Sequence, residues 1–147
     1  MKRFFRYISL LLVAVMLLTV PAFAAEQRAS SYIMSTCVYL NPTTGTQFRV
    51  WHEVIALGIM DELGACEIKV QESTNGVSWT TVKTYTPADT PNMVAQDTAG
   101  YAACVTYTGI AGRYYRARIV QFAENSSGRG EVIDYTDPIR VVSLETA

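Results

Sequence analysis

The stretch EIKVQESTNGVSWTTVKTYT, from Glu67 to Thr86, decides the fold. Two runs rich in Val, Ile, Thr, Trp and Tyr flank the dipeptide Asn75-Gly76, and these two residue types tolerate the positive φ angles of a tight type I′ turn. In the first run Ile68 and Val70 alternate with charged or polar residues, and a period of two places the apolar side chains on one face of a strand. We therefore predict a β-hairpin with one buried face and one solvent face.

A second signature, GIAGRYYRARIVQF, runs from Gly109 to Phe122. In it Tyr115, Ala117 and Ile119 alternate with arginines, which again indicates a strand with one apolar face. The Gly-x-x-Tyr entry has the pattern of a tyrosine corner, in which a Tyr near the start of a strand bonds back to the preceding loop. The sixth strand of immunoglobulin-like and fibronectin type III-like sandwiches usually begins in this way.

The rest of the chain from Ala25 to Ala147 divides into short strands and turns, without a long helical pattern. A loop is expected at Met60 to Gly64, and a long surface connection at Thr86 to Thr98, because Pro87 and Pro91 interrupt it. The other strands are expected at Tyr32–Leu40, Gln47–Leu57, Tyr101–Thr108, Arg113–Ala123 and Glu131–Asp137, with a short edge strand at Ile139–Leu144. About seven strands at this spacing predict a single all-β domain, an antiparallel β-sandwich of the fibronectin type III or immunoglobulin-like kind.

That fold also predicts one strand pairing. In a fibronectin-like order the third strand lies beside the sixth. Glu67 and Gln71 would then lie opposite Arg116 and Arg118 on the outer face. Such cross-strand pairs contribute a few tenths of a kcal/mol each.

The N-terminus has the pattern of a signal peptide over residues 1–24. Three basic residues precede an apolar run from Ile8 to Val20, and the small-residue site Pro21-Ala22-Phe23-Ala24 follows. The apolar run is shorter than the roughly 20 residues that a membrane-spanning helix needs. We therefore predict cleavage after Ala24 and a secreted protein, released or held at the cell surface and without membrane insertion.

The charge balance argues against a nucleic-acid partner. The formal net charge is −1, and removal of the three positive charges in the signal peptide makes the exported chain more acidic. A nucleic-acid-binding domain usually carries a basic stripe.

The cysteines Cys37, Cys66 and Cys104 form an odd set for an exported chain, so at least one thiol is left unpaired. Together with His52 they lack the paired spacing of structural zinc sites. We expect small buried hydrophobic side chains with at most one disulfide, and neither a metal nor a cofactor. The sequence leaves open which cysteines pair.

Candidate catalytic residues are few. His52 falls on the predicted inward face of its strand, where a buried, hydrogen-bonded histidine is expected rather than a general base. Asp61 with Glu62, and Asp134 with Asp137, are expected as solvated turn acids or a weak calcium site. No Gly-rich phosphate-binding loop follows a strand. We therefore expect no enzyme.

Four motifs, two of them within the stretches quoted above, carry a resemblance that covers nearly the whole exported chain. They are R-A-S-S-Y-I from Arg28, G-I-M-D-E-L-G-A from Gly58, V-Q-E-S-x-N-G-x-S-W from Val70 and G-I-A-G-x-Y-Y-R-A from Gly109. In these the chain resembles an uncharacterised family of short secreted proteins from Gram-positive, mainly gut-dwelling bacteria. The family's fuller E-S-S-D-G-G-S-T-W turn is shorter here and lacks the acid. The resemblance implies the fold and export, and no activity.

Binding is the function class that the sequence favours, because secreted sandwiches often present aromatic side chains on a sheet face or loop. Trp51 shares a strand face with charged residues and is the first candidate for ligand binding, with Trp79 and Tyr85 next. The alternative is that the connection from Thr86 to Thr98 covers Trp51 and that Trp79 folds over its own hairpin.

Two hypotheses follow. The first is a secreted recognition module that binds a glycan or a surface protein through exposed aromatic side chains. The second is a structural or self-assembling cell-envelope protein that associates through edge strands or the unpaired thiol.

Overall fold

The computed structural model describes residues 31–142, and in them the protein is all-β. Seven strands pair antiparallel in one sheet, which confirms that part of the prediction. The strands are β1 (Ile33–Pro42), β2 (Gln47–Ser73), β3 (Thr80–Tyr85), β4 (Val94–Thr108), β5 (Tyr114–Asn125), β6 (Gly128–Tyr135) and β7 (Ile139–Arg140), and a short 3-10 helix, η1 (Pro91–Met93), precedes β4. The predicted signal peptide, residues 1–24, lies outside the described residues. No helix within residues 31–142 is long and apolar enough to cross a membrane.

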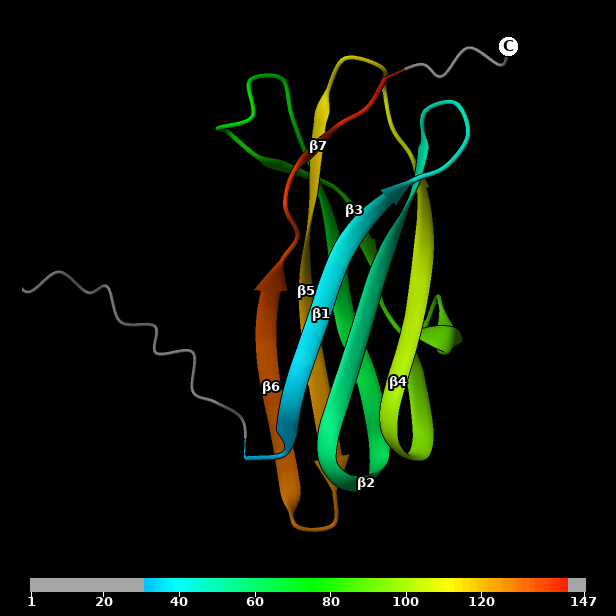
Figure 1. Ribbon diagram of the computed structural model, residues 1–147, viewed down its shortest axis with the longest axis vertical. Coiled ribbons are helices and arrows are strands. Elements are labelled where there is room, and N and C mark those ends of the chain that lie inside the picture. Colours follow the sequence, from blue (N-terminus) through cyan, green and yellow to red (C-terminus); the bar gives the residue numbers. More distant parts are fainter. Residues whose placement is uncertain (1–30, 143–147) are drawn as a thin grey trace, which may run out of the picture.

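The sheet curls because β2 and β4 are long and bend together. The first part of β2 pairs with β1 on one side and with β4 on the other, and its last part pairs with β5 and β3. The register between β2 and β4 shifts between Ile55 and Met60, and Figure 1 shows both strands curling round at the lower end of the molecule. The sheet is therefore a curled half-barrel whose two halves face each other across the core.

Two predicted connections are wrong at this bend. Residues 60–64 were expected as a loop but continue β2, where Met60 and Leu63 are buried. Residues 94–98 were expected as part of a surface connection but form the first part of β4 and pair with residues 60–64. Gly64 makes this pairing possible, because a Cβ at that position would lie 2.2 Å from the carbonyl oxygen of Met93.

The core consists of two apolar clusters. Along β2, Val50 belongs to the first cluster and Val54 to the second, and along β5 Ile119 belongs to the first and Ala123 to the second. The residues between them on the inward faces are His52 on β2 and Gln121 on β5, with exposed fractions of 1% and 0%. A polar level therefore separates the two clusters.

The predicted adjacency of the hairpin's first strand and β5 is confirmed. Gln71 lies opposite Arg116, and the Arg116 Nε donates a hydrogen bond of 2.7 Å to Gln71 Oε1. Arg118 bonds diagonally to Glu67, with 2.8 Å between nitrogen and oxygen. Ile68, Val70 and the inward residues of β5 are fully buried, as their alternation predicts.

Candidate functional site

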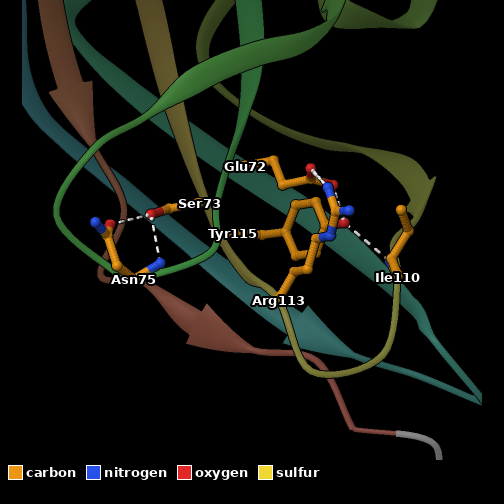
Figure 2. A network of polar contacts seen from close by, with 6 residues as sticks. All are labelled: Glu72, Ser73, Asn75, Ile110, Arg113 and Tyr115. Carbon is orange, nitrogen blue, oxygen red and sulfur yellow. Dashed lines mark hydrogen bonds and ion pairs between the residues drawn. The ribbon is translucent and has the colours of Figure 1, made fainter.

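The hairpin turn differs from the predicted two-residue turn. β2 ends at Ser73 and β3 begins at Thr80, so residues 74–79 form the loop. Gly76 has a φ of +73°, but Asn75 does not have the positive φ that a type I′ turn requires. Figure 2 shows why: the Ser73 hydroxyl accepts the backbone N–H of Asn75 at 3.2 Å and lies beside the Asn75 side chain. These side-chain bonds fix a longer loop that ends at Trp79.

The predicted tyrosine corner is confirmed at Tyr115. Its hydroxyl accepts the backbone N–H of Ile110 at 2.9 Å and donates to the Glu72 carboxylate, which also pairs with Arg113 (Figure 2). Burial, followed by the bond to Glu72, raises the pKa of Tyr115 to about 12. The hydrogen bond from Tyr115 is the main cause that lowers the pKa of Glu72. This network ties β2, β5 and the preceding loop together.

Trp79 holds a cation on one outer face of the sheet. The Arg116 guanidinium lies 4.5 Å from the centre of the Trp79 ring and 5.1 Å from the centre of the Tyr135 ring. Trp79 therefore contacts Arg116 of β5, which in turn contacts Tyr135 of β6, rather than only folding over its own hairpin. On the same face Glu67 pairs with Lys69 at 3.0 Å as well as with Arg118. We call the outer face of residues 67–71, β5 and β6, with Trp79, the paired-charge face.

Tyr85 joins two strands. It lies half-buried at the end of β3, and its hydroxyl donates a hydrogen bond of 2.8 Å to the backbone carbonyl of Thr106 on β4. Burial, followed by the nearby Tyr107, raises its pKa. Lys83 lies 5.3 Å from the centre of the Tyr85 ring. The Tyr85 ring and hydroxyl are therefore already in contact with neighbouring groups.

Trp51 lies on the opposite outer face, as its strand pattern predicts. In register across β1, β2 and β4, Tyr39, Trp51 and Cys104 form one row. The Tyr39 and Trp51 rings are stacked, with centroids 6.0 Å apart and planes 8° from parallel. Trp51 is half-buried and Tyr39 is 46% exposed. The connection expected over Trp51 instead lines a hollow beside Phe122.

A row with a charged residue lies on each side of this aromatic row. The neighbouring rows across the same three strands are Asn41, Arg49 and Thr106 on one side and Cys37, Glu53 and Ala102 on the other. All six residues are exposed. We call these three rows the aromatic face.

Arg49 differs from every other basic residue in residues 31–142. It makes no ion pair, hydrogen bond or ring contact with the described part of the chain. The other basic side chains each contact a carboxylate, a carbonyl, an amide or an aromatic ring; they are Lys69, Lys83, Arg113, Arg116, Arg118, Arg129 and Arg140. Among the described residues, the one Lys or Arg side chain left free for a ligand is thus next to the aromatic pair.

The cysteines do not pair with one another. Cys37 is exposed on the aromatic face, so the expectation of burial is wrong there, and Cys66 and Cys104 are half-buried. The outward direction of alternate strand residues places Cys37 and Cys104 outside the core. Burial, followed by the charge of Glu131, raises the pKa of Cys66, whose thiol donates to the carbonyl of Val120 at 3.5 Å.

His52 is buried as predicted, but it is not hydrogen-bonded. Neither ring nitrogen has a partner among the described residues, and the ring meets Tyr101 edge-on at 6.4 Å between centroids. Burial lowers the pKa of His52 from 6.5 to about 4, which keeps the imidazole neutral. No group of three or more potential metal-ligating His, Cys, Asp or Glu side chains occurs in residues 31–142.

A hollow of about 390 Å³ lies where residues 87–91 pass over β2 and β5. Cys66, Phe122 and Arg129 line it. The Arg129 guanidinium stacks 3.9 Å from the centre of Phe122 and pairs with Glu124 and Glu131. Its charge is therefore already neutralised, unlike that of Arg49.

Comparison with models of protein families, with curated proteins and with solved structures finds no match to this chain. The resemblance to secreted proteins of Gram-positive bacteria remains a prediction.

The predicted binding residues lie apart. Trp51 belongs to the aromatic face, Trp79 to the paired-charge face, and Tyr85 joins β3 to β4. Tyr39 and Arg49, the two neighbours that distinguish Trp51, were not predicted as site residues. Cys37 and Tyr39 alternate with more buried residues along β1, and this alternation could have indicated that Tyr39 faces outward.

Proposed function

We propose that this protein is a secreted, non-catalytic recognition module that binds a glycan on its aromatic face. The observation that carries the proposal is the outward-facing, stacked pair of Tyr39, 46% exposed, and half-buried Trp51, beside Arg49, a basic residue without a partner in residues 31–142.

The arrangement suits a sugar. Aromatic rings offer a rigid apolar surface, and a small number of placed polar groups then fix the orientation of a bound ligand. Arg49, a hydrogen-bond donor, and Glu53, an acceptor, lie in the rows on opposite sides of the Trp51 row, where they are available to a ligand. A saccharide ring has an apolar face for the rings and hydroxyls for these side chains.

The non-catalytic part of the proposal rests on the carboxylates and the histidine near the aromatic face. Hydrolysis of a glycosidic bond uses a pair of Asp or Glu side chains. The three rows of the aromatic face carry one carboxylate, that of Glu53. His52 is adjacent to Trp51 in sequence but points into the core, on the other side of the sheet, out of reach of a bound substrate.

Export and family membership are part of the same proposal. They are supported by the pattern of residues 1–24 and by the four shared motifs. N-terminal sequencing of protein recovered from the culture medium should begin at Ala25, and an intact N-terminus on cell-bound protein would contradict cleavage.

We also propose that the curled sheet is a variant of the fibronectin type III or immunoglobulin-like sandwich. The tyrosine corner at Tyr115 and the pairing of residues 67–73 with β5 support this relationship. The continuous passage of β2 and β4 between the two halves of the sheet is the difference.

The test is a glycan array probed with residues 25–147, followed by titration of each hit in solution. Trp51→Ala should weaken binding at least about tenfold, the usual cost of losing a stacked aromatic contact. Trp79→Ala is the matched control, because it removes the same side chain from the other face. Equal loss in both variants, or no hit from the folded protein, would contradict the proposal.

A second candidate, a self-assembling envelope protein, is favoured by one observation, the exposed thiol of Cys37. An exposed thiol in an oxidising compartment can form an intermolecular disulfide. Dimers that disappear on reduction and in Cys37→Ser would support this candidate, and a monomer at all concentrations without reductant would remove it.

A further inference from the structure

We propose that the ligand of the aromatic face is an acidic saccharide, whose ring stacks on Tyr39 and Trp51 and whose carboxylate or sulfate binds Arg49. This inference rests on the proposed function and adds the charge of the ligand to it.

The charge of Arg49 is not balanced by an ion pair within residues 31–142. The other basic side chains in residues 31–142 already have partners, and on the paired-charge face Arg116 and Arg118 are held by Gln71, Glu67 and aromatic rings. Arg49 is exposed and has none of these. A guanidinium presents donors in a rigid fork that fits a carboxylate or sulfate with two parallel hydrogen bonds.

Arg49 lies close to the stacked rings of Tyr39 and Trp51. Arg49 and Trp51 are two residues apart on one face of β2, so their Cα atoms are separated by about 6.6 Å along the strand. An acidic group on a sugar ring that covers Trp51 therefore lies within reach of the Arg49 side chain. Asn41 and Thr106 flank Arg49 in its row and add an amide and a hydroxyl as further donors.

The charge on the other side of the rings is negative. Glu53 lies two residues beyond Trp51 on β2, on the side away from Arg49, and it has no ion pair among the described residues. Glu53 accepts hydrogen bonds from sugar hydroxyls and repels a second anionic group. The face therefore fits one acidic group per bound ring, oriented toward Arg49.

The test uses matched pairs of soluble saccharides that differ in charge. We would titrate residues 25–147 with sialyllactose against lactose, with oligogalacturonate against its methyl ester, and with a sulfated galactose oligosaccharide against the unsulfated one. At least one acidic member should bind about tenfold tighter than its neutral partner, because a charge-assisted hydrogen bond contributes on that scale. The carboxylated and sulfated pairs identify which anion the protein prefers.

Two variants test whether Arg49 is the source of the preference for the acidic saccharide. Arg49→Gln should remove the preference, so that the acidic and neutral members of a pair bind with equal affinity. Lys83→Gln, which removes the same charge from β3, should leave the preference unchanged. Far-ultraviolet circular dichroism and the unfolding temperature confirm that each variant is folded.

The outcomes separate this inference from the proposed function. Equal affinity for acidic and neutral members in the natural protein, or a preference that survives Arg49→Gln, would overturn the acidic ligand while binding through Trp51 stands. Binding that is unaffected by Trp51→Ala would overturn both.

Discussion

The two outer faces of this sheet differ in whether their arginine side chains contact aromatic rings and polar side chains. On the paired-charge face Arg116 is bonded to Gln71 and enclosed by two rings, and Arg118 is paired with Glu67. On the aromatic face the rings stack on each other, and Arg49 has no partner in the described part of the chain. A cation that contacts an aromatic face is attracted to it, so the first arrangement stabilises the fold. The second leaves the same groups available to a ligand.

The interior behind the aromatic face also has an unsatisfied group. His52, next to Trp51 on β2, is buried without a hydrogen-bond partner, whereas Tyr115 on β5 has a donor and an acceptor for its hydroxyl. Burying a polar group without a partner costs free energy. Gln121 on β5 also has one atom without a partner among the described residues, Oε1, but its Nε2 donates to Asp134 at 3.0 Å, so His52 is the less satisfied of the two buried polar side chains.

The largest effect that this difference predicts is a loss of stability in acid. The pKa of His52 is about 4 in the folded protein against 6.5 as its ordinary value, so protons bind the unfolded chain more tightly. The contribution of His52 to the free energy of unfolding is fully present above pH 6.5 and falls as the pH drops. Below pH 4 the free energy of unfolding is lower by about 3 kcal/mol.

Urea unfolding from pH 7.5 to 3.5 measures this loss. In His52→Leu the pH dependence should shrink by most of that amount, because the remaining loss comes from carboxylates such as Glu72, whose pKa is lowered. Identical pH profiles for the two proteins would show that His52 is solvated or hydrogen-bonded in solution.

A smaller effect separates two tyrosines. Tyr115→Phe should lower the free energy of unfolding by about 2 kcal/mol, because the Ile110 N–H and the Glu72 carboxylate both lose their partner. Tyr39→Phe keeps the ring that stacks on Trp51 and should change it by less than about 0.5 kcal/mol. Chemical denaturation of both variants is the measurement, and equal costs would contradict the contrast between the faces.

Much of the paired-charge half was predictable from sequence. The alternation around Ile68 and Tyr115 fixes which side chains are buried, and the Gly-x-x-Tyr entry indicates the tyrosine corner. These signals are local, so a short window contains them. The turn at Asn75 was mispredicted because the Ser73 hydroxyl accepts backbone N–H groups in place of a tight hairpin.

The other half depends on contacts between distant residues. Residues 60–64 look like a polar loop, and they form a strand because Gly64 allows the backbone of Met93 to approach closely. The outward direction of Trp51 followed from its charged neighbours, but the stack on Tyr39 depends on the register between β1 and β2. The isolation of Arg49 emerges only when the partners of the other basic residues are known.

The smallest effect compares two arginines. Arg116→Gln should cost about 1 kcal/mol in the free energy of unfolding, since it removes one hydrogen bond and two ring contacts at a partly exposed site. Arg49→Gln should cost less than about 0.5 kcal/mol, because the side chain is exposed and makes no hydrogen bond, ion pair or ring contact within residues 31–142. Thermal and urea unfolding compare them, and a larger cost for Arg49→Gln would mean that its side chain has a partner.

The most direct measurement is a titration followed by the indole N–H signals of Trp51 and Trp79 in a two-dimensional ¹⁵N–¹H spectrum. Each face carries one of these indoles, and Trp51→Phe assigns the two signals. On addition of the acidic saccharide that binds most tightly, the Trp51 signal should shift in a saturable way while the Trp79 signal stays in place. A saturable shift of Trp79 alone, or no shift of either signal with any saccharide of the matched pairs, would contradict the account.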